Sequence, residues 1–500
     1  MPSESWAELY PWQLDRASRT PFFRQIYAQI RRAVLSGALG PGTKLPSSRA
    51  LAVSLGVARA SVVAVYEQLL TEGYIETRRG AGTFVSAAVA GLGKQSHRGR
   101  AGDKRSFRPP RAFLEFERAQ QHDERLPFNT GRTLIDARTA EIWRKLMQYA
   151  GRSLGAGDLG YTDPSGLPEL RRCLCEYLRA SRAVRCDPEQ IVVTAGTQQA
   201  VDIAIRVLLE PGDEVWVEDP GYPLTYAQLL LAKVQPRPIP VDAHGLVVDA
   251  GLRRAPQARG AFVTPSHQFP TGVALSMARR LELLAWARES GAFLVEDDYT
   301  SEFRYSGPPL ASLQGLDDDE RVIYVGTLNK ALFPGLRLGY AVVPHALLPD
   351  FINARYLIDR QPPSLLQTVV AEFMRQGHFG AHIRRMRQVY HEQRDALVAT
   401  LVRRAPEYLD VEAPDQGMHL VAHLKRNDGS DIEIETAAHR AGIVVRAVSR
   451  FYWTAPARQG LMLGFSGFPR AVIVPAAVHL ARTVAETTNS HVAAASATRN

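Results

Sequence analysis

Four polar segments in the last three quarters of the chain hold residue types that can do chemistry together. Each segment directly follows a short apolar run. The residues are Gly196, Thr197 and Gln198 in the first segment, Tyr222 in the second, Asp297 and Tyr299 in the third, and Thr327, Lys330 and Arg337 in the fourth. The start of a helix offers free backbone N–H groups to a phosphate, and a lysine amine forms a Schiff base with an aldehyde.

Together these residue types indicate a site for pyridoxal 5'-phosphate. A carboxylate keeps a pyridine nitrogen protonated, a phenol donates a hydrogen bond to the ring oxygen, and an aromatic side chain covers the ring face. Each residue also has a plain structural interpretation: Lys330 as a surface charge, Tyr222 as a core residue and Asp297 as a helix cap. Their shared position after apolar runs favours the cofactor site.

The apolar runs predict the strands that bring these residues together. The runs are Ile191–Thr194, Glu214–Glu218, Gly260–Thr264, Phe293–Glu296 and Val322–Val325. They alternate with helices such as Met277–Glu289, and short apolar strands between helices predict a mostly parallel α/β sheet that is covered on both faces. No G-x-G-x-x-G follows the first strand, so a dinucleotide site is not predicted. Functional residues are expected at the carboxyl ends of the strands.

The N-terminal quarter predicts three amphipathic helices and a basic hairpin. Apolar residues recur at helical spacing over residues 21–35, 47–55 and 58–72, and glycines follow each segment. Residues 74–85 contain two short β-like runs around a glycine-rich turn. The second and third helices are only a short turn apart, which is the spacing of a helix-turn-helix.

Basic residues of this quarter lie where DNA would be contacted. The amino end of the third helix, with Arg59 and Ser61, suits the major groove. Arg49 could hold a backbone phosphate, and Arg78 and Arg79 on the hairpin could reach the minor groove. The alternative is a small module for protein contact, in which these arginines are only solvated.

Length and charge support a division into domains. A chain of 500 residues is long enough for two or three domains, and its 45% apolar share is typical of globular proteins. Residues 1–115 hold 17 Lys and Arg against 8 Asp and Glu, whereas the remaining residues hold 43 of each. This asymmetry suggests a nucleic-acid-binding head on a neutral body, although a basic solubilising tail has the same charge.

Other features of the composition favour a cytoplasmic protein. No apolar run is long enough to span a bilayer, and the N-terminus has no signal core. Three cysteines in so long a chain indicate a reducing compartment. Cys173 and Cys175 are two positions apart in a helical segment and would face different directions, so no metal site is expected.

Residues 88–125 are predicted to form a flexible linker. Between Gly91 and Arg111 the segment has seven Lys and Arg, one Asp and no apolar periodicity, and such a composition cannot bury a core. Its charge would either add non-specific DNA affinity or only keep the segment soluble. We expect a head over residues 18–87, a body over residues 126–488 and a disordered tail over residues 489–500.

The head resembles the winged helix-turn-helix domain of GntR-type bacterial transcription regulators. From Pro21 to Val85 it shares the block G-x-L-x-P-G-x-x-L-P-S-x-R-x-L-A and the wing E-G-Y…G-x-G-T-F-V. The resemblance implies contacts to DNA by Arg49, Arg59, Ser61 and Gly82. Ala58 and Ala60 stand where the family often has polar residues, which leaves the base specificity open.

The body resembles fold-type I, aspartate aminotransferase-like proteins. Y-T-D-P-S-G-L-P-E-L-R, A-G-T-Q-Q-A, E-D-P-G-Y, V-E-D-D-Y and T-L-N-K…G-L-R-L-G-Y occur in the order of that family. The resemblance implies that Lys330 carries the cofactor, that Asp297 pairs with its ring nitrogen and that Tyr222 stacks on the ring. It also implies that the phosphate and the ring hydroxyl are held by a further set: Gly196, Thr197, Gln198, Thr327, Arg337 and Tyr299, with Tyr161 from the other subunit of a dimer.

Two positions depart from the aminotransferase pattern. Phe269 replaces the asparagine before Pro-Thr-Gly, so His267 or Gln268 would have to bond the ring oxygen; a structural histidine is an equal alternative. The late R-x-S-F-like segment, which supplies the arginine for the substrate carboxylate, reads Met462–Phe465 and lacks that arginine. Arg450 is the first candidate to replace it and Arg446 the second.

A GntR-type head joined to an aminotransferase-like body resembles the MocR/PdxR-like transcription regulators. The resemblance implies a homodimer whose heads lie over the partner's body and read an operator with repeated half-sites in double-stranded DNA. The effector would be a small amino compound that exchanges with Lys330, or the vitamer itself. Leu224 stands where several relatives have a basic residue for an effector carboxylate, which leaves the charge of the effector open. The alternative function is an active aminotransferase whose head controls only its own gene.

Overall fold

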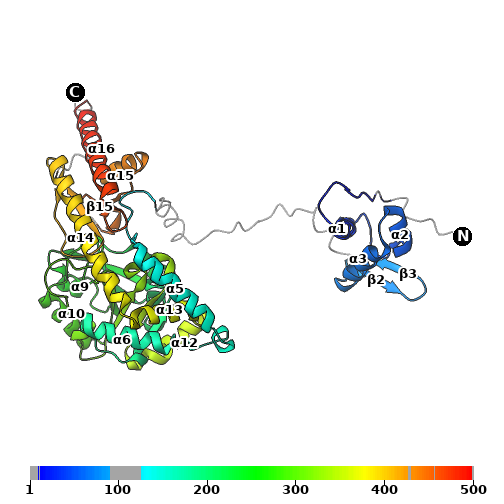
Figure 1. The fold of residues 1–500 in the computed structure, drawn as a ribbon, viewed down its shortest axis with the longest axis horizontal. Coiled ribbons are helices and arrows are strands. Elements are labelled where there is room, and N and C mark those ends of the chain that lie inside the picture. The colour runs from blue at the N-terminus through cyan, green and yellow to red at the C-terminus, as the bar shows by residue number, and fades with distance from the viewer. Residues whose placement is uncertain (1–9, 11, 90–124, 426–429, 455–456, 498–500) are drawn as a thin grey trace. The chain divides into compact units, whose positions relative to one another are not determined.

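The computed structural model describes residues 10, 12–89, 125–425, 430–454 and 457–497. The chain divides into two compact units, Met1–Arg108 and Pro109–Asn500, which we call the head and the body. Figure 1 shows the elements of each unit. Residues 90–124 lie outside the described part, so most of the expected linker is not described.

The head has three helices and a small antiparallel sheet. They are α1 (Phe22–Leu35), β1 (Lys44–Leu45), α2 (Ser48–Leu55), α3 (Arg59–Thr71), β2 (Ile75–Arg78) and β3 (Gly82–Val85), with the strands in the order β1-β3-β2. The side chain of Ser47 accepts a hydrogen bond from the backbone N–H of Ala50, which caps α2. The predicted helices and hairpin are confirmed; β1 was not predicted, because two residues carry no measurable periodicity.

One hydrophobic core holds the head together. Fully buried side chains from all three helices meet in it: Ile30 from α1, Leu51 from α2, and Val62, Val65 and Leu69 from α3. Ile75 and Val85 of the hairpin close the same core. The buried face of α3 leaves its amino end at the surface, where Arg59 is exposed.

The body is built on an eight-stranded mixed sheet. Its strands are β4 (Ile191–Thr194), β5 (Glu214–Asp219), β6 (Gln235–Asp242), β7 (Gly245–Leu246), β8 (Gly260–Val263), β9 (Phe293–Asp298), β10 (Val322–Thr327) and β11 (Gly339–Val342), in the order β4-β11-β10-β9-β8-β5-β6-β7. The pairs from β10 to β6 are parallel, and β11 is antiparallel to both β10 and β4. All five predicted strands are confirmed. Because β4 runs in the same direction as β10, their carboxyl ends share one edge with those of β9, β8 and β5.

Helices cover both faces of this sheet. They are α5 (Ala137–Ser153), α6 (Pro168–Arg182), α7 (Thr197–Leu208), α8 (Pro223–Leu231), α9 (Val248–Arg254), α10 (Met277–Ser290), α11 (Leu328–Ala331), α12 (Leu348–Asp359), α13 (Ser364–Arg375) and α14 (His378–Arg404). Val215 and Val217 of β5 pack in one core with residues of α7 and α12, whereas Trp216 between them packs on the other face against α9 and α10. This alternation is what a strand buried on both faces requires.

A second, four-stranded antiparallel sheet follows, which the sequence analysis did not predict. Its strands are β12 (Leu409–Val411), β13 (His419–Leu424), β14 (Arg446–Ala447) and β15 (Gly460–Gly464), in the order β12-β13-β15-β14. It packs with α15 (Asp431–Arg440) and α16 (Arg470–Ala497), and α16 lies beside α14 (Figure 1).

Helix α16 runs through residues that were expected in a disordered tail. It ends at Ala497, although the tail was predicted from residue 489. The segment is rich in alanine, which has the highest helix propensity, and it continues a helix that is already formed. Within the described part of the chain, no helix is long and apolar enough to cross a membrane.

Candidate functional site

Lys330 lies at the carboxyl edge of the large sheet. Strand β10 ends at Thr327, whose side-chain oxygen accepts a hydrogen bond from the backbone N–H of Asn329 and so starts the short helix α11. The Lys330 amine donates to the backbone oxygen of Gly131 at 3.2 Å. Gly131 has φ +83°, and a Cβ there would be 2.2 Å from the Lys330 amine nitrogen. Only glycine leaves the lysine this room.

Asp297, at the end of the neighbouring strand β9, presents an oxygen without a hydrogen-bond partner. Its Oδ1 atom is buried, and none of the described residues bonds it. Burial raises the pKa of Asp297 to about 7, Asp298 and Glu218 raise it as well, and the charge of Lys330 lowers it. A buried carboxyl oxygen left unpaired costs free energy. The site therefore favours a ligand that carries a proton or a positive charge to this oxygen.

Two tyrosines approach the same place. Tyr222 follows the turn after β5 and precedes α8, and its ring lies 5.1 Å from that of Phe269. Burial, followed by the charge of Asp297, raises the pKa of Tyr222 to about 12. The same two causes raise the pKa of Tyr299 well above its ordinary value. Both phenols therefore stay protonated and can donate hydrogen bonds.

His267 contacts Tyr299 directly. Its Nδ1 atom lies 3.0 Å from the Tyr299 hydroxyl, and its ring lies 5.1 Å from that of His419. Burial lowers the pKa of His267 well below its ordinary value, so the ring is neutral. Gln268, the other predicted candidate, donates its amide to the backbone oxygen of Pro220 at 2.8 Å. Of the two, His267 is the residue that touches the phenol.

The start of α7 lies at the carboxyl end of β4, where the sequence predicts the phosphate cradle. Gly196 is the residue before the helix, has φ +131° and provides no side-chain cap, so the first N–H groups of α7 have no side-chain partner there. A Cβ on Gly196 would be 2.9 Å from the Asn329 amide nitrogen and 4.0 Å from the Arg337 guanidinium. Thr197, Thr327 and Arg337 thus belong to one neighbourhood. Gln198 is exposed, and its backbone oxygen accepts from Gln228 at 2.9 Å.

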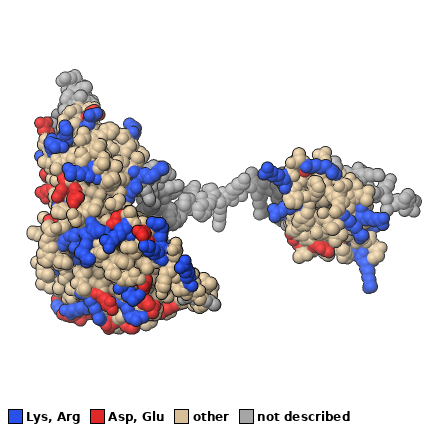
Figure 2. Space-filling view, viewed as in Figure 1, with Lys and Arg blue, Asp and Glu red and all other residues tan. Residues whose placement is uncertain are grey.

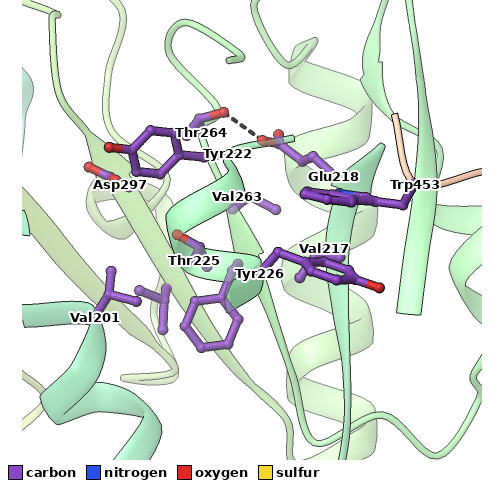
Figure 3. A pocket seen from close by; sticks show the side chains of 12 residues that line it. Val201, Val217, Glu218, Tyr222, Thr225, Tyr226, Val263, Thr264, Asp297 and Trp453 are labelled. Carbon is purple, nitrogen blue, oxygen red and sulfur yellow. Dashed lines mark hydrogen bonds between the residues drawn. The ribbon is translucent and has the colours of Figure 1, made fainter. Parts of the chain in front are cut away.

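Behind these residues lies a small cavity of about 30 Å³ (Figure 3). Tyr222, Asp297, Glu218, Thr264 and Trp453 are among its lining residues. Glu218 accepts a hydrogen bond from the Thr264 hydroxyl at 2.5 Å, and burial raises its pKa to about 7. A volume of this size holds about one or two water molecules, so the space beside Tyr222 and Asp297 is not completely filled by side chains.

Two predicted residues lie apart from this cluster in the single chain. Tyr161 is 79% exposed, and the guanidinium of Arg360 lies 4.4 Å from its ring centre. Arg450 forms an ion pair with Glu435 at 2.6 Å. Their partners, Arg360 and Glu435, do not belong to the cluster around Lys330.

Sequence reasoning missed Gly131 and His419. Gly131 stands in a Thr-Gly pair ahead of the first helix of the body, which signals a turn and not a contact with a lysine nearly 200 residues later. His419 lies on β13, whose short run did not stand out from the surrounding sequence. Its pKa is lowered to about 4 by burial.

The head presents its predicted DNA-contacting residues at the surface. Arg49, Arg59 and Arg79 are exposed, and Ser61 is partly exposed near the amino end of α3. Ala58 gives this end no side-chain cap, so its N–H groups can meet a phosphate. On the face of this unit shown in Figure 2, basic side chains cover more of the surface than acidic ones do.

The two arginines of the hairpin have different surroundings. Arg78 forms an ion pair with Glu76 at 2.8 Å, and its guanidinium lies 4.6 Å from the centre of the Phe84 ring. Arg79 is exposed at the turn beside Gly80, which has φ +77°, and Gly82 starts β3 with φ +112°. The turn therefore directs Arg79 to solvent while Arg78 is held on the hairpin.

Comparison with known proteins matches both units. The family of bacterial regulatory proteins named gntR matches residues 23–85, and aminotransferase class I and II matches residues 125–460. The chain is 38% identical to the probable rhizopine catabolism regulatory protein MocR of Rhizobium meliloti over 91% of this chain and 92% of that protein. It is 32% identical to the pyridoxine biosynthesis transcriptional regulator PdxR of Corynebacterium glutamicum over 91% of this chain and 94% of that protein. The chain belongs to the MocR/PdxR family of transcription regulators.

A solved structure supports the fold of this MocR/PdxR-type regulator. The kynurenine aminotransferase of Pyrococcus horikoshii, in complex with PMP, has a TM-score of 0.66 and 26% identity, and the match covers 79% of this chain and 99% of that chain. The predicted fold class, a winged helix-turn-helix head and a fold-type I aminotransferase-like body, is confirmed. The regulator therefore has a head of a DNA-binding family.

Proposed function

We propose that this regulator binds pyridoxal 5'-phosphate through Lys330 and that its body senses a small amino compound. The observation that carries the proposal is the buried Asp297 Oδ1 atom without a partner among the described residues. A protonated pyridine nitrogen would satisfy this oxygen and would favour the ionised carboxylate. The charge of Lys330 acts on the same carboxyl group, which supports a shared site.

The surrounding residues have the chemistry to hold the remaining parts of the cofactor. The N–H groups at the start of α7, the Thr327 hydroxyl and the Arg337 guanidinium would bind the phosphate. Tyr222 would cover the ring face. When bound, pyridoxal phosphate supplies an aldehyde carbon that reacts reversibly with amines and a ring that withdraws electrons. Gly131 keeps space at the Lys330 amine, where that carbon would attach.

Tyr299 and His267 would set the hydrogen bond to the ring oxygen. The neutral imidazole of His267 lies at hydrogen-bond distance from the Tyr299 hydroxyl. If Nδ1 donates its proton to the phenol oxygen, the phenol proton is directed toward the ligand. This arrangement would replace the asparagine that aminotransferases have at the position of Phe269.

A sensor fits these residues better than an efficient aminotransferase. Met462 occupies the position of the arginine that aminotransferases use for the substrate carboxylate, so a substrate would be held less firmly in the geometry for transamination.

The alternative, an active aminotransferase with an autoregulatory head, predicts rapid conversion of the cofactor to its amine form, with release of a keto acid, in a single-turnover assay. A response to the vitamer alone predicts DNA affinity that changes with cofactor and is insensitive to amines.

The signal would pass through a homodimer. Tyr161 is exposed in the single chain, and it would contact a second copy of the chain as in fold-type I proteins whose sites are shared between subunits. Two heads would then read two half-sites of an operator, and an altered arrangement of the bodies would change the spacing of the heads.

Substitution of Lys330 tests the attachment of the cofactor. Purified protein with added pyridoxal phosphate should gain a visible absorption band, and borohydride reduction should fix one phosphopyridoxyl group on the peptide that contains Lys330. Lys330→Ala should lose both signals, whereas Lys145→Ala, a substitution of an exposed lysine on α5, should keep them. A wild-type protein that stays colourless with excess cofactor would refute the proposal.

A further inference from the structure

The small sheet of the body carries an arginine on the face that lies against the site. In the antiparallel ladder, Arg446 of β14 stands directly opposite Met462 of β15, and Met462 also stands opposite Val421 of β13. Directly opposed residues of an antiparallel pair point to the same face. The side chains of Arg446, Met462 and Val421 therefore share one face of this sheet.

That face packs against residues of the site. Met462 and Val421 belong to one apolar cluster with Phe269, and the Phe269 ring lies 5.1 Å from that of Tyr222. His419 is on the same face two positions before Val421, and its ring lies 5.1 Å from that of His267. The opposite face, with Leu420, Leu461 and Leu463, packs in the main core of the body.

Arg446 differs from the other candidate arginine, Arg450. The Arg446 Nε atom is buried and has no hydrogen-bond partner among the described residues. Burial lowers the pKa of Arg446, whereas the neighbouring ionisable groups Glu435 and Tyr222 raise it. Glu435 already accepts a hydrogen bond from Arg450 at 2.6 Å, and the Arg450 side chain is 52% exposed. The carboxylate nearest to both arginines is thus bonded by Arg450.

We infer that Arg446 binds the carboxylate of the effector, so that the effector is an amino acid and not a simple amine. The inference rests on the proposed function, because it assigns the amine of the same compound to the cofactor at Lys330. Opposed residues of an antiparallel pair have their Cα atoms about 4.5 to 5.5 Å apart. The guanidinium that is missing at Met462 is therefore supplied from the neighbouring strand, on the same face. A guanidinium binds a carboxylate with two parallel hydrogen bonds.

Matched probes test this assignment. Each pair has the same chain with and without a carboxylate: glycine and methylamine, β-alanine and ethylamine, γ-aminobutyrate and propylamine. Affinity is measured from the change in visible absorption of the cofactor-loaded full-length protein. At least one carboxylated probe should bind more tightly than its amine, and propionate, which has no amine, should compete with that probe.

Variants identify the residue responsible. Arg446→Met should weaken the preferred carboxylated probe by roughly ten- to hundredfold and leave the matched amine unchanged. Arg446→Lys, which keeps the charge without the paired hydrogen bonds, should bind that probe with an affinity between those of the wild type and Arg446→Met. Arg450→Met should weaken the probe less than Arg446→Met does, because it only leaves Glu435 free to pair with Arg446. Near-ultraviolet circular dichroism checks the fold, and if Arg446→Met does not fold, Arg446→Lys and the propionate competition decide.

The failures of the two proposals are distinguishable. If the wild-type protein gains no cofactor absorption, the proposed function is wrong. If the cofactor binds and amines exchange, but no carboxylated probe is preferred to its amine, only the assignment of Arg446 is wrong. The same conclusion follows if Arg450→Met loses the preference and Arg446→Met keeps it.

Discussion

At the scale of single residues, Asp297 is buried and lies near two other carboxyl groups. Its pKa of about 7 reflects removal from water and the charges of Asp298 and Glu218. Burial also raises the pKa values of Glu218, Glu296 and Glu302 to about 7. In the cofactor-free body these carboxyl groups hold protons near neutral pH that an unfolded chain would release. The stability that these four carboxyl groups contribute to the cofactor-free body should therefore fall as pH rises from about 4 to 7.

Asp297→Asn should separate the stability of the body from its affinity for the cofactor. The folded pKa of Asp297 lies above its ordinary value of 3.8, so ionisation destabilises the fold at high pH, and asparagine removes this effect. At pH 8 the cofactor-free variant should be more stable than the wild type by roughly 1 to 4 kcal/mol, measured by urea unfolding. Its affinity for pyridoxal phosphate should fall, because the neutral asparagine side chain cannot form an ion pair with the protonated pyridine nitrogen. Equal pH profiles for the two proteins would contradict the assignment.

His267 and Arg450 show how far spacing along the chain can predict which residues belong to the site. Both residues lie close in sequence to motif positions of the aminotransferase-like pattern. The contact of His267 with Tyr299 supports its place in the site, whereas Arg450 bonds Glu435 instead. Sequence distance could not separate Arg450 from Arg446, since which of the two faces the site depends on strand pairing.

At the scale of elements, the turn after β5 is joined to the segment that follows β14. The Asp219 carboxylate accepts hydrogen bonds from the backbone N–H groups of Trp453 at 2.8 Å and Thr454 at 3.1 Å. The Trp453 ring stacks on that of Tyr226 with centroids 3.9 Å apart. These contacts connect the turn that carries Tyr222 to the small sheet that carries Arg446.

Asp219→Ala should loosen this connection. Asp219 is only 5% exposed, and the substitution leaves two backbone N–H groups without their acceptor. The body should lose about 2 to 4 kcal/mol of unfolding free energy, measured by denaturant unfolding. Asp202→Ala, which removes a partly exposed ion pair with Arg206 on α7, should cost less than about 1 kcal/mol. Similar losses in both variants would show that Asp219 has no special role.

The elements of the head predict a difference between the two wing arginines. Each phosphate contact contributes about 0.9 to the slope of log affinity against log salt concentration. Arg59→Ala and Arg79→Ala should each reduce that slope by about 1, because both side chains are exposed. Arg78→Ala should reduce it less, since Arg78 is bonded to Glu76. Fluorescence anisotropy with a labelled duplex over a salt series measures the slopes, and a larger effect of Arg78 would contradict the observed geometry.

At the scale of the whole molecule, the DNA binding that the family of the head implies and the cofactor binding proposed for the body belong to units with separate cores. The head packs around its own apolar cluster, and the body packs around its sheets. The net positive charge of the chain comes from residues 1–115, since the remaining residues hold equal numbers of basic and acidic side chains.

Separating the units should separate these two abilities. A fragment of residues 109–500 should keep the cofactor absorption and lose DNA binding. A fragment of residues 1–108 should bind a duplex selected by the full-length protein at least about tenfold more weakly, because it loses the second linked contact. Absorption spectra measure cofactor binding, and gel shifts measure DNA binding. Equal DNA affinity of the head fragment and the full chain would argue against a dimer that reads two half-sites.

The sequence by itself determined the helices and hairpin of the head, the five apolar strands and the residues that follow them. These features depend on periodicity, on glycine positions and on short motifs, all of which act over a few neighbouring residues. Only the tertiary structure decided that Gly131 faces Lys330, that Asp297 keeps an unpaired oxygen and that Arg446 opposes Met462. These contacts join segments tens to hundreds of residues apart, and they follow from strand order and pairing, which local patterns do not encode.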